Sequence, residues 1–425
     1  MPGVNAYAAG EDAVAAGNRS TAIGNEATAP EVGATSIGAG ARANGTNSFA
    51  AGNFSTAQGP NSVGVGNNAM SAGPSSVAIG DHALAQRDFA IALGSNATAS
   101  AAEASALGVN TRASGAASNA LGANATASGA SSSALGANAT ASGESSNAFG
   151  ANATASGLNS IAVGTTSTAA EEAIAVGPKA RATGVEALAL GNTASATETL
   201  SSAVSAYSTA SGGSATAIGA FAQATNAAAV AVGASAIASG ESAIATGNAS
   251  NAQGASSIAI GNSANAQEAH AAAVGFHATA SGVSSIAFGD IAVATGAQAI
   301  AIGLNAQASA VDSTAFGDSA QASAEDALAI GHSAVARARA ASHWAATSTR
   351  RLKTQSRSAT TRSPITPTAS RSGRDLQQPS VRNPATLLMA CRDHRHRRVK
   401  STTVAVPSAA LRQAQPITTR STLHS

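Results

Sequence analysis

Histidine, cysteine and carboxylate side chains are the groups of this 425-residue sequence that could hold a metal ion or carry acid–base chemistry. Metal sites need such ligands at short, defined spacings. The histidines of the first 336 residues are instead scattered along the chain: His82, His270, His277 and His332. The motif CRDHRH places Cys391 near His394 and His396, but three ligands in an arginine-rich segment make a weak site. The sequence therefore predicts no metal centre and solvated histidines on turns.

Glycine-rich strings and acidic residues also fail to form a cofactor-binding or catalytic pattern. GVGNNAMSAG, residues 64–73, lacks the G-K-[ST] ending and the following helix of a phosphate loop. Calcium-binding rolls of the nonapeptide type need an aspartate in every repeat, and the acidic residues here are sporadic. No catalytic triad or carboxylate pair repeats. We therefore expect neither an enzyme nor a bound cofactor.

The remaining composition is dominated by small side chains. Aromatic residues make up 3% of the chain and charged residues 10%, and 43 residues are glycine. Each large apolar side chain supplies about 1.5–3 kcal/mol when buried, so a chain this poor in them must build its core from alanine and serine. Residues 1–336 hold 6 Lys and Arg against 19 Asp and Glu, a formal charge of −13, whereas residues 337–425 hold 17 against 2, a charge of +15.

Glycine recurs every fourteen residues from residue 10 to residue 331, with one step of thirteen between Gly164 and Gly177. This frame holds glycine at 23 of 24 places, the exception being Ser205. The residue before the frame position is Val, Ile, Leu or Phe in 21 of the 24 cases. A second glycine often marks the middle of the unit, as at Gly115. Each unit therefore consists of two short alternating segments separated by turns, where glycine supplies unusual backbone angles.

Fourteen residues are too few for two helices with their connections, but they fit one coil of a β-solenoid with two short strands. Successive coils would stack about 4.8 Å apart through parallel pairing, so the 24 units would give a rod on the order of 110 Å long. We predict an all-β fold, a parallel β-roll of 14-residue repeats over residues 1–336.

Side-chain direction predicts an assembly. In SVAIG, residues 76–80, Ser76 and Ala78 share one face and Val77 and Ile79 share the other. Only the small side chains fit inside so thin a roll, so the large ones point outward in an apolar stripe that a soluble monomer does not tolerate. Closed symmetry would bury this stripe between copies. The residues expected to pack there include Val77, Ile79, Ile91, Leu93, Ile258, Ile260, Ile286, Phe288, Ile300 and Ile302.

The segments SVAIGDHALA (residues 76–85) and NSIAVGTTS (residues 159–167) resemble the head repeat N-S-V-A-I-G-x-x-S of YadA-like trimeric autotransporter adhesins. The resemblance spans about residues 5–336 and recurs in nearly every unit. It implies a left-handed parallel β-roll, a homotrimer and a place at the bacterial cell surface, on the outer membrane. It also implies binding to host extracellular-matrix proteins, collagen above all, or to host or bacterial cells. No nucleic-acid partner is expected.

The family's collagen-binding motif can be carried over by position. The closest match consists of Asn159, Ser160, Ile161, Ala162, Val163, Gly164 and Ser167. A second match begins at Asn61 and Ser62 and departs from the motif at two later positions. For any one of these residues we favour a structural role, such as subunit packing for Ile161 and Val163 and a turn for Gly164.

Residues 337–425 do not continue the family pattern. They contain no apolar heptads for a coiled-coil stalk, and we expect no membrane anchor in them. Three interpretations stay open: a basic tail that binds nucleic acid or an acidic membrane surface, a disordered low-complexity linker, and translation in a shifted reading frame. The shifted frame is favoured because the segment replaces elements that the family uses for display. The genomic sequence near codon 336, read in the other frames, would test it.

Two other functions compete with adhesion. Regular threonines on a flat solenoid face can order ice, and Thr98, Thr126, Thr140, Thr154 and Thr168 form such a column. The same column later holds chemically different residues, which ranks ice binding lower. The other competing interpretation of function is a truncated adhesin fragment without a cellular role, because neither a signal peptide nor an anchor is expected here.

Overall fold

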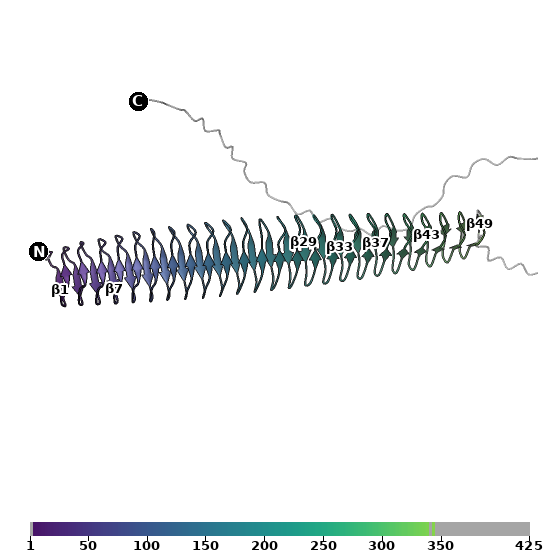
Figure 1. Ribbon diagram of the computed structural model, residues 1–425. Coiled ribbons are helices and arrows are strands. Elements are labelled where there is room, and N and C mark those ends of the chain that lie inside the picture. The colour runs from purple at the N-terminus through teal and green to yellow at the C-terminus, as the bar shows by residue number, and fades with distance from the viewer. Residues whose placement is uncertain (1–2, 340–341, 345–425) are drawn as a thin grey trace, which may run out of the picture. The chain divides into compact units, whose positions relative to one another are not determined.

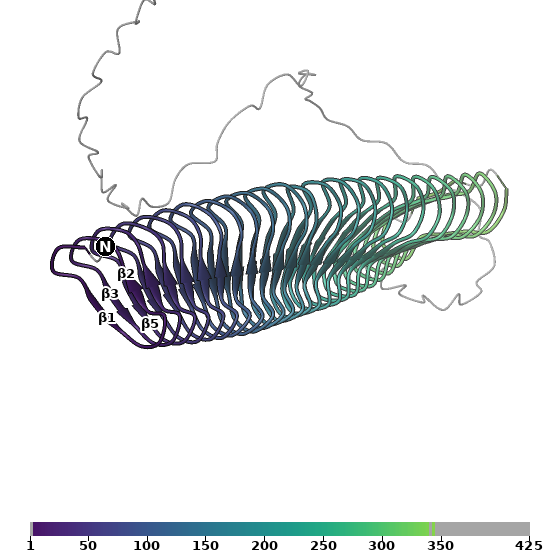
Figure 2. The same ribbon diagram turned by 60° about the vertical axis from the view of Figure 1, so that its left-hand side comes forward.

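The computed structural model describes residues 3–339 and 342–344, which form a parallel β-solenoid of about 24 coils without a helix. The coils stack in a single row from β1 to β49 (Figure 1). Turned by 60°, the same row appears as a series of narrow flattened loops (Figure 2). Each coil contributes one strand to each of two sheets, called sheet A and sheet B. The all-β parallel solenoid predicted from the glycine period is confirmed.

Sheet A consists of the 25 odd-numbered strands, and all but the last of them cover the three residues before a frame position. It runs in steps of fourteen residues from β1 (Tyr7–Ala9) to β47 (Leu328–Ile330) and β49 (Ser342–Trp344). The one step of thirteen falls between β23 (Ile161–Val163) and β25 (Ile174–Val176). Neighbouring strands pair in parallel without any slip in register across that step, since Ile161 lies opposite Ile174.

Sheet B consists of the even-numbered strands, each of two residues, four and five places after the frame position. It runs from β2 (Val14–Ala15) in steps of fourteen residues to β48 (Val335–Ala336). Its shorter step of thirteen lies between β24 (Thr168–Ala169) and β26 (Arg181–Ala182). Because each outward side chain sits above its equivalent in the next coil, any chemical character of one coil repeats as a column.

Sheet A continues for one strand beyond residue 336, where the sequence analysis ended the repeats. β49 pairs with β47, with Leu328 opposite Ser342. Residues 345–425, which carry most of the predicted basic tail and the CRDHRH motif, lie outside the described residues. A helix that could span a membrane is absent from the part of the chain that the structure describes.

Backbone hydrogen bonds join each coil to the coils on both sides. The Tyr7 amide donates to the carbonyl of Ser20 in the following coil (2.9 Å), and the Gly24 amide donates to that of Ala9 in the preceding one (2.8 Å). Parallel strands cannot satisfy these groups within one coil. A single coil therefore has little stability of its own, and the stack forms as a unit.

The interior is built from alanine and serine, as the composition predicts. Ala78, Ala162 and Ala259 are fully buried, and the buried polar side chains are serines apart from Thr111. Many of these serines donate to the carbonyl three residues before them, as Ser76 Oγ does to Gly73 (2.6 Å). A buried hydroxyl costs free energy unless it is paired, so these local bonds let serine share the core with alanine.

The turns explain the glycine frame. Frame glycines such as Gly80 have φ of +136°, a conformation open to glycine but strained for other residues. Ser205 takes the same place with φ of +108°. The mid-coil glycines need a different explanation, because they do not have positive φ. A Cβ on Gly115 would overlap the carbonyl of Gly129 in the next coil, so close stacking favours glycine there.

Candidate binding surfaces

Each coil offers four surfaces that repeat along the stack. The sheet-A face comprises the outward side chains of the odd-numbered strands, and the sheet-B face comprises those of the even-numbered strands. The trailing turns follow sheet-A strands, as Asp81 and His82 follow β11 (Val77–Ile79). The leading turns precede them, as Pro74 and Ser75 precede β11. These columns, rather than single side chains, are what a large partner would meet.

The sheet-A face is mostly apolar and carries no formal charge from β1 to β47. From β3 (Thr21–Ile23) to β47 the first and third residues of each strand point outward and the middle residue is buried, as in β11 and β37 (Ile258–Ile260). None of the outward positions from β1 to β47 holds Asp, Glu, Lys or Arg. Phe288 remains 55% exposed and Ile260 42% exposed in the single chain. The outward direction predicted for this stripe is therefore confirmed.

The ten residues predicted to pack between subunits all lie on this face, at outward positions. They are half-buried or exposed in the single chain: Val77, Ile79, Ile91, Leu93, Ile258, Ile260, Ile286, Phe288, Ile300 and Ile302. The stripe is not uniform. The first column, formed by the first residue of each strand, is polar from β15 (Ser105–Leu107) to β21 (Asn147–Phe149). The second column, formed by the third residue, is Leu or Phe in these strands.

The structure divides the candidate collagen motif into an inner and an outer half. Ser160, Ala162 and Ser167 point into the roll and are fully buried, and Ser160 Oγ donates to the Gly157 carbonyl (2.7 Å). Ser167 Oγ likewise donates to the Gly164 carbonyl (2.9 Å). These inner side chains stabilise the turns and do not reach the surface.

The outer half of the motif consists of Asn159, Ile161 and Val163. Asn159 is exposed on a leading turn with φ of +53°, and the two aliphatic residues are half-buried on the sheet-A face. Gly164 has φ of +130° in the trailing turn. The second match repeats the division, because Asn61 is exposed and Ser62 is buried. The sequence brings these residues together in one coil, but only the outer three are available to a partner.

The sheet-B face carries the threonine column found in the sequence. Thr126, Thr140, Thr154 and Thr168 lie in register on successive strands and are half-buried. Arg112 interrupts the column between Thr98 and Thr126. The only formal charges at outward positions of this face in the described residues are arginines. They are Arg42, Arg112 and Arg181.

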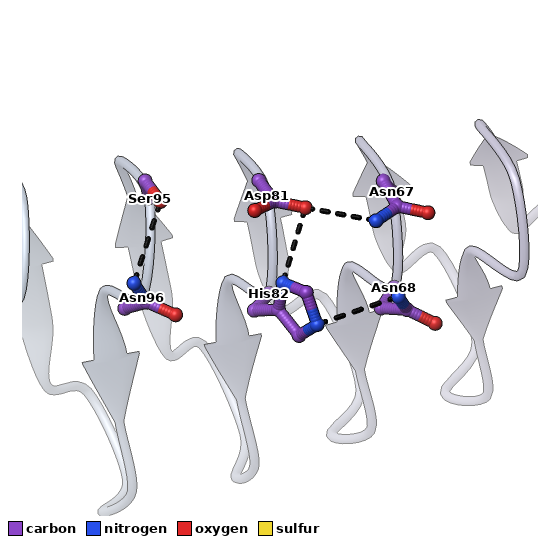
Figure 3. A network of polar contacts seen from close by, with 6 residues as sticks. All are labelled: Asn67, Asn68, Asp81, His82, Ser95 and Asn96. Carbon is purple, nitrogen blue, oxygen red and sulfur yellow. Dashed lines mark hydrogen bonds and ion pairs between the residues drawn. The ribbon is translucent and has the colours of Figure 1, made fainter.

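A network of polar side chains joins two successive trailing turns (Figure 3). Asn67 Nδ2 donates to Asp81 Oδ1 (3.0 Å) from the preceding coil, and His82 Nδ1 lies 3.1 Å from the same oxygen. His82 Nε2 lies 3.4 Å from Asn68 Nδ2. The hydrogen bond from Asn67, and then that from His82, hold the pKa of Asp81 below its ordinary value, because they favour the charged carboxylate.

The network is a ladder between coils rather than a reaction centre. Its groups are exposed, and each bond links side chains of the same turn or of turns one coil apart. The other histidines of residues 3–336, His270, His277 and His332, are also exposed on turns. Within the described residues no group of three His, Cys, Asp or Glu side chains is placed to hold a metal ion.

The acidic side chains gather on the leading turns, a feature that the sequence analysis did not separate from the net charge. Position relative to the frame glycine would have shown it. The acidic residues of these turns are Glu31, Asp88, Glu103, Glu144, Glu171, Glu172, Glu186, Glu198, Glu241, Glu268, Asp312, Glu325 and Asp326.

Fold and surfaces together define a repeat protein that presents long, repeated faces to a partner. The model of the YadA head domain repeat, two copies of the repeat each time, matches nearly the whole stack. The matched residues are 2–27, 29–55, 57–83, 88–111, 113–139, 141–167, 169–194, 182–204, 210–236, 238–264, 252–278, 266–292, 280–306 and 308–334. The chain belongs to the family of YadA-like heads, which are parts of bacterial surface adhesins rather than enzymes.

Comparison with solved structures finds the collagen-binding domain of the Yersinia adhesin YadA. It shows 20% identity over 48% of this chain and 83% of its own, with a TM-score of 0.17. That score is too low for the solved domain to define the geometry of this chain. No curated protein sequence matches.

Proposed function

We propose that this chain is the head of a homotrimeric surface adhesin that binds host extracellular-matrix proteins of the collagen kind, or other cells, through its repeated outer surfaces. The observation that carries the proposal is the YadA head repeat itself, which extends from residue 2 to residue 334. An adhesin head works by presenting surface, and this chain presents the same surface in coil after coil.

The sheet-A face supports the assembly part of the proposal. A long, uncharged apolar face on a monomer would associate without limit unless closed symmetry buried it. A trimer with this face turned to the symmetry axis covers every sheet-A strand at once. Three subunits and a left-handed coil are the arrangement that family membership suggests.

The outer half of the collagen motif supports the ligand part. Asn159 lies beside the sheet-A face, whereas Ile161 and Val163 lie on it and are covered in the proposed trimer. Ligand contact in this coil thus falls mainly to Asn159, at the edge of the sheet-A face where two subunits of the proposed trimer meet. Since each turn recurs along three subunits, weak single contacts add up through avidity, and no single coil is expected to be indispensable.

Two measurements on the full chain test the proposal. Light scattering after size-exclusion chromatography should give the mass of three chains. Binding to immobilised collagen should exceed binding to albumin, and should fall when Asn61 and Asn159 are both replaced by Ala. A control with Gln223→Ala, on the sheet-B face, should bind as the parent chain does. A monomer, or equal binding to both surfaces, would contradict the proposal.

Ice binding is a second candidate function, because the sheet-B face carries a column of threonines. The proposal distinguishes the two, because an adhesin head gives no thermal hysteresis. Hysteresis that disappears when Thr140 and Thr154 are replaced by Val or Asn would favour ice binding instead.

A further inference from the structure

In several coils the leading and trailing turns carry side chains of opposite charge or of shared apolar character. These side chains cannot meet within one chain. In each coil of fourteen residues, the residue with positive φ in the leading turn lies seven places before its counterpart in the trailing turn. The strand and its flanking residues hold the two positions roughly 15–20 Å apart. Any interaction between such residues must therefore come from another copy.

Charge is the first property that matches. Arg19 on a leading turn shares its coil with Glu26 on the trailing turn, and both are exposed. Glu171 and Glu172 on a leading turn share their coil with Lys179 on the trailing turn. Lys179 is the only lysine in residues 1–336. Within residues 3–339 and 342–344, neither Arg19 nor Lys179 takes part in an ion pair.

Apolar character matches in two further coils. Leu200 on a leading turn is 51% exposed, and Tyr207 on the trailing turn of the same coil is 49% exposed. Val283 and Ile291 repeat the arrangement with exposures of 47% and 48%. Leu200, Tyr207 and Ile291 adopt φ between +55° and +59°, which bulky side chains adopt only at a cost. Within the described residues Tyr207 stacks on Phe221 of the next trailing turn, with ring centroids 5.0 Å apart, and both side chains stay about half exposed.

Strand direction decides which turns meet in a ring of copies. All sheet-A strands are parallel and run from leading turn to trailing turn. Rotation about an axis along the stack keeps that direction, so the trailing turns of one copy face the leading turns of the next. Such a contact is heterologous and closes into a ring. A pure rotation also keeps each coil at its own height.

We infer that the trailing turns of each subunit pack against the leading turns of its neighbour at the same coil, so that Lys179 pairs with Glu171 and Glu172 of the next copy, and Glu26 with Arg19. This inference rests on the proposed homotrimer and adds its register. The matched pairs fix the register of one subunit against the next. The apolar face alone does not fix it, because it repeats at every coil and would let one subunit slide along another. Asp312 and Asp318 place acid on both turns of one coil, where the same contact is repulsive.

Cross-linking of the full chain tests the register. Cys391 is replaced by Ser, and Lys179→Cys is combined in three variants with Glu172→Cys, with Asn159→Cys or with Glu186→Cys. These partners are the positive-φ residues of the leading turns in the same coil, one coil before and one coil after. A short bismaleimide should link the same-coil variant into covalent trimers on a denaturing gel, with loss of most of that product in the other two.

The outcomes separate the register from the assembly. A parent chain that scatters as a monomer overturns the homotrimer and the register together. A trimer whose links form equally in all three variants, or best between different coils, overturns the register alone.

A charge exchange gives a second measurement that does not depend on cysteine chemistry. Arg19→Glu and Glu26→Arg should each shift dissociation of the oligomer to a higher protein concentration, because they place like charges together. The double exchange should restore the parent value. Failure of the double exchange to restore it would contradict the pairing of these two residues.

Discussion

The sheet-A and sheet-B faces share one interior, one register and nearly one hydrogen-bond pattern, yet their outer residues differ in number, size and charge. Sheet A presents two side chains per strand, mostly aliphatic and never charged in the described coils, as in Ile258 and Ile260. Sheet B presents one, most often threonine but elsewhere arginine, other polar residues or aliphatic residues, as in Thr168, Arg181 and Ile237. The alanine core stabilises the coil, whereas the outer residues decide what each side meets.

The largest effect should come from placing charged side chains on the sheet-A face. Replacing Ile258, Ile260, Ile300 and Ile302 by Asp should reduce the light-scattering mass of the full chain to that of one subunit, because buried carboxylates at a subunit contact are costly. Gln223→Asp, at an exposed position of the sheet-B face, is the control and should leave the mass unchanged. An unchanged mass in the quadruple variant would remove the sheet-A face from the assembly.

Enlarging the shared core should weaken the coil whichever sheet carries the change. Ala259 on sheet A and Ala155 on sheet B are fully buried, so Leu at either place should lower the free energy of unfolding by about 1–3 kcal/mol. Chemical unfolding followed by circular dichroism measures it. Thr154→Leu, at the outward position beside Ala155, is the control. Equal stability of Ala259→Leu and the parent chain would mean that the interior has spare room.

The single frame position without glycine offers a gain in stability. Ser205 has φ of +108°, so Ser205→Gly should raise the free energy of unfolding by about 1 kcal/mol, the order of the strain stored by such a residue. Ser208→Gly should instead lower it, since Ser208 Oγ donates to the Ser205 carbonyl (2.8 Å) in the core. Thermal unfolding would order the two variants, and the reverse order would contradict the strain argument.

The sheet-B face should tolerate change without effect on assembly. Arg112→Ala and Arg181→Ala remove exposed side chains that make no ion pair within the described residues. The free energy of unfolding should stay within about 0.5 kcal/mol of the parent value, and the oligomer mass should not change. A lower mass would show that this face also lies between subunits.

The smallest effect concerns a single turn. Asn67→Ala removes the main hydrogen bond that lowers the pKa of Asp81, so that pKa should rise toward its ordinary value in an NMR titration. A carboxyl with a lowered pKa in the folded state contributes stability above its unfolded pKa and loses it as the pH falls through the folded value. Asn96→Ala, in the next coil, should leave the pKa of Asp81 unchanged.

The sequence alone allowed prediction of nearly every strand, because one coil determines the next through the glycine frame and the alternation around Val77 and Ile79. It also predicted which side chains point outward, since only alanine and serine fit the interior. The predicted ligand set nevertheless included the buried Ser160 beside the exposed Asn159, because it was carried over whole from the family motif, which lists both without their direction. The sequence also did not reveal that mid-coil glycines such as Gly115 serve close stacking, which depends on the distance to the next coil.

The coil of thirteen residues between Gly164 and Gly177 has a consequence for how such a protein changes over generations. Its leading turn is one residue shorter than the others, and the strands on both sides still pair in register. Whole coils can be gained or lost in the same way, because each one ends where it begins except for one step along the stack. Duplication of a single repeat would lengthen the molecule by about 4.8 Å while leaving both faces chemically alike. The length of the stack and the chemical character of its faces can therefore evolve separately.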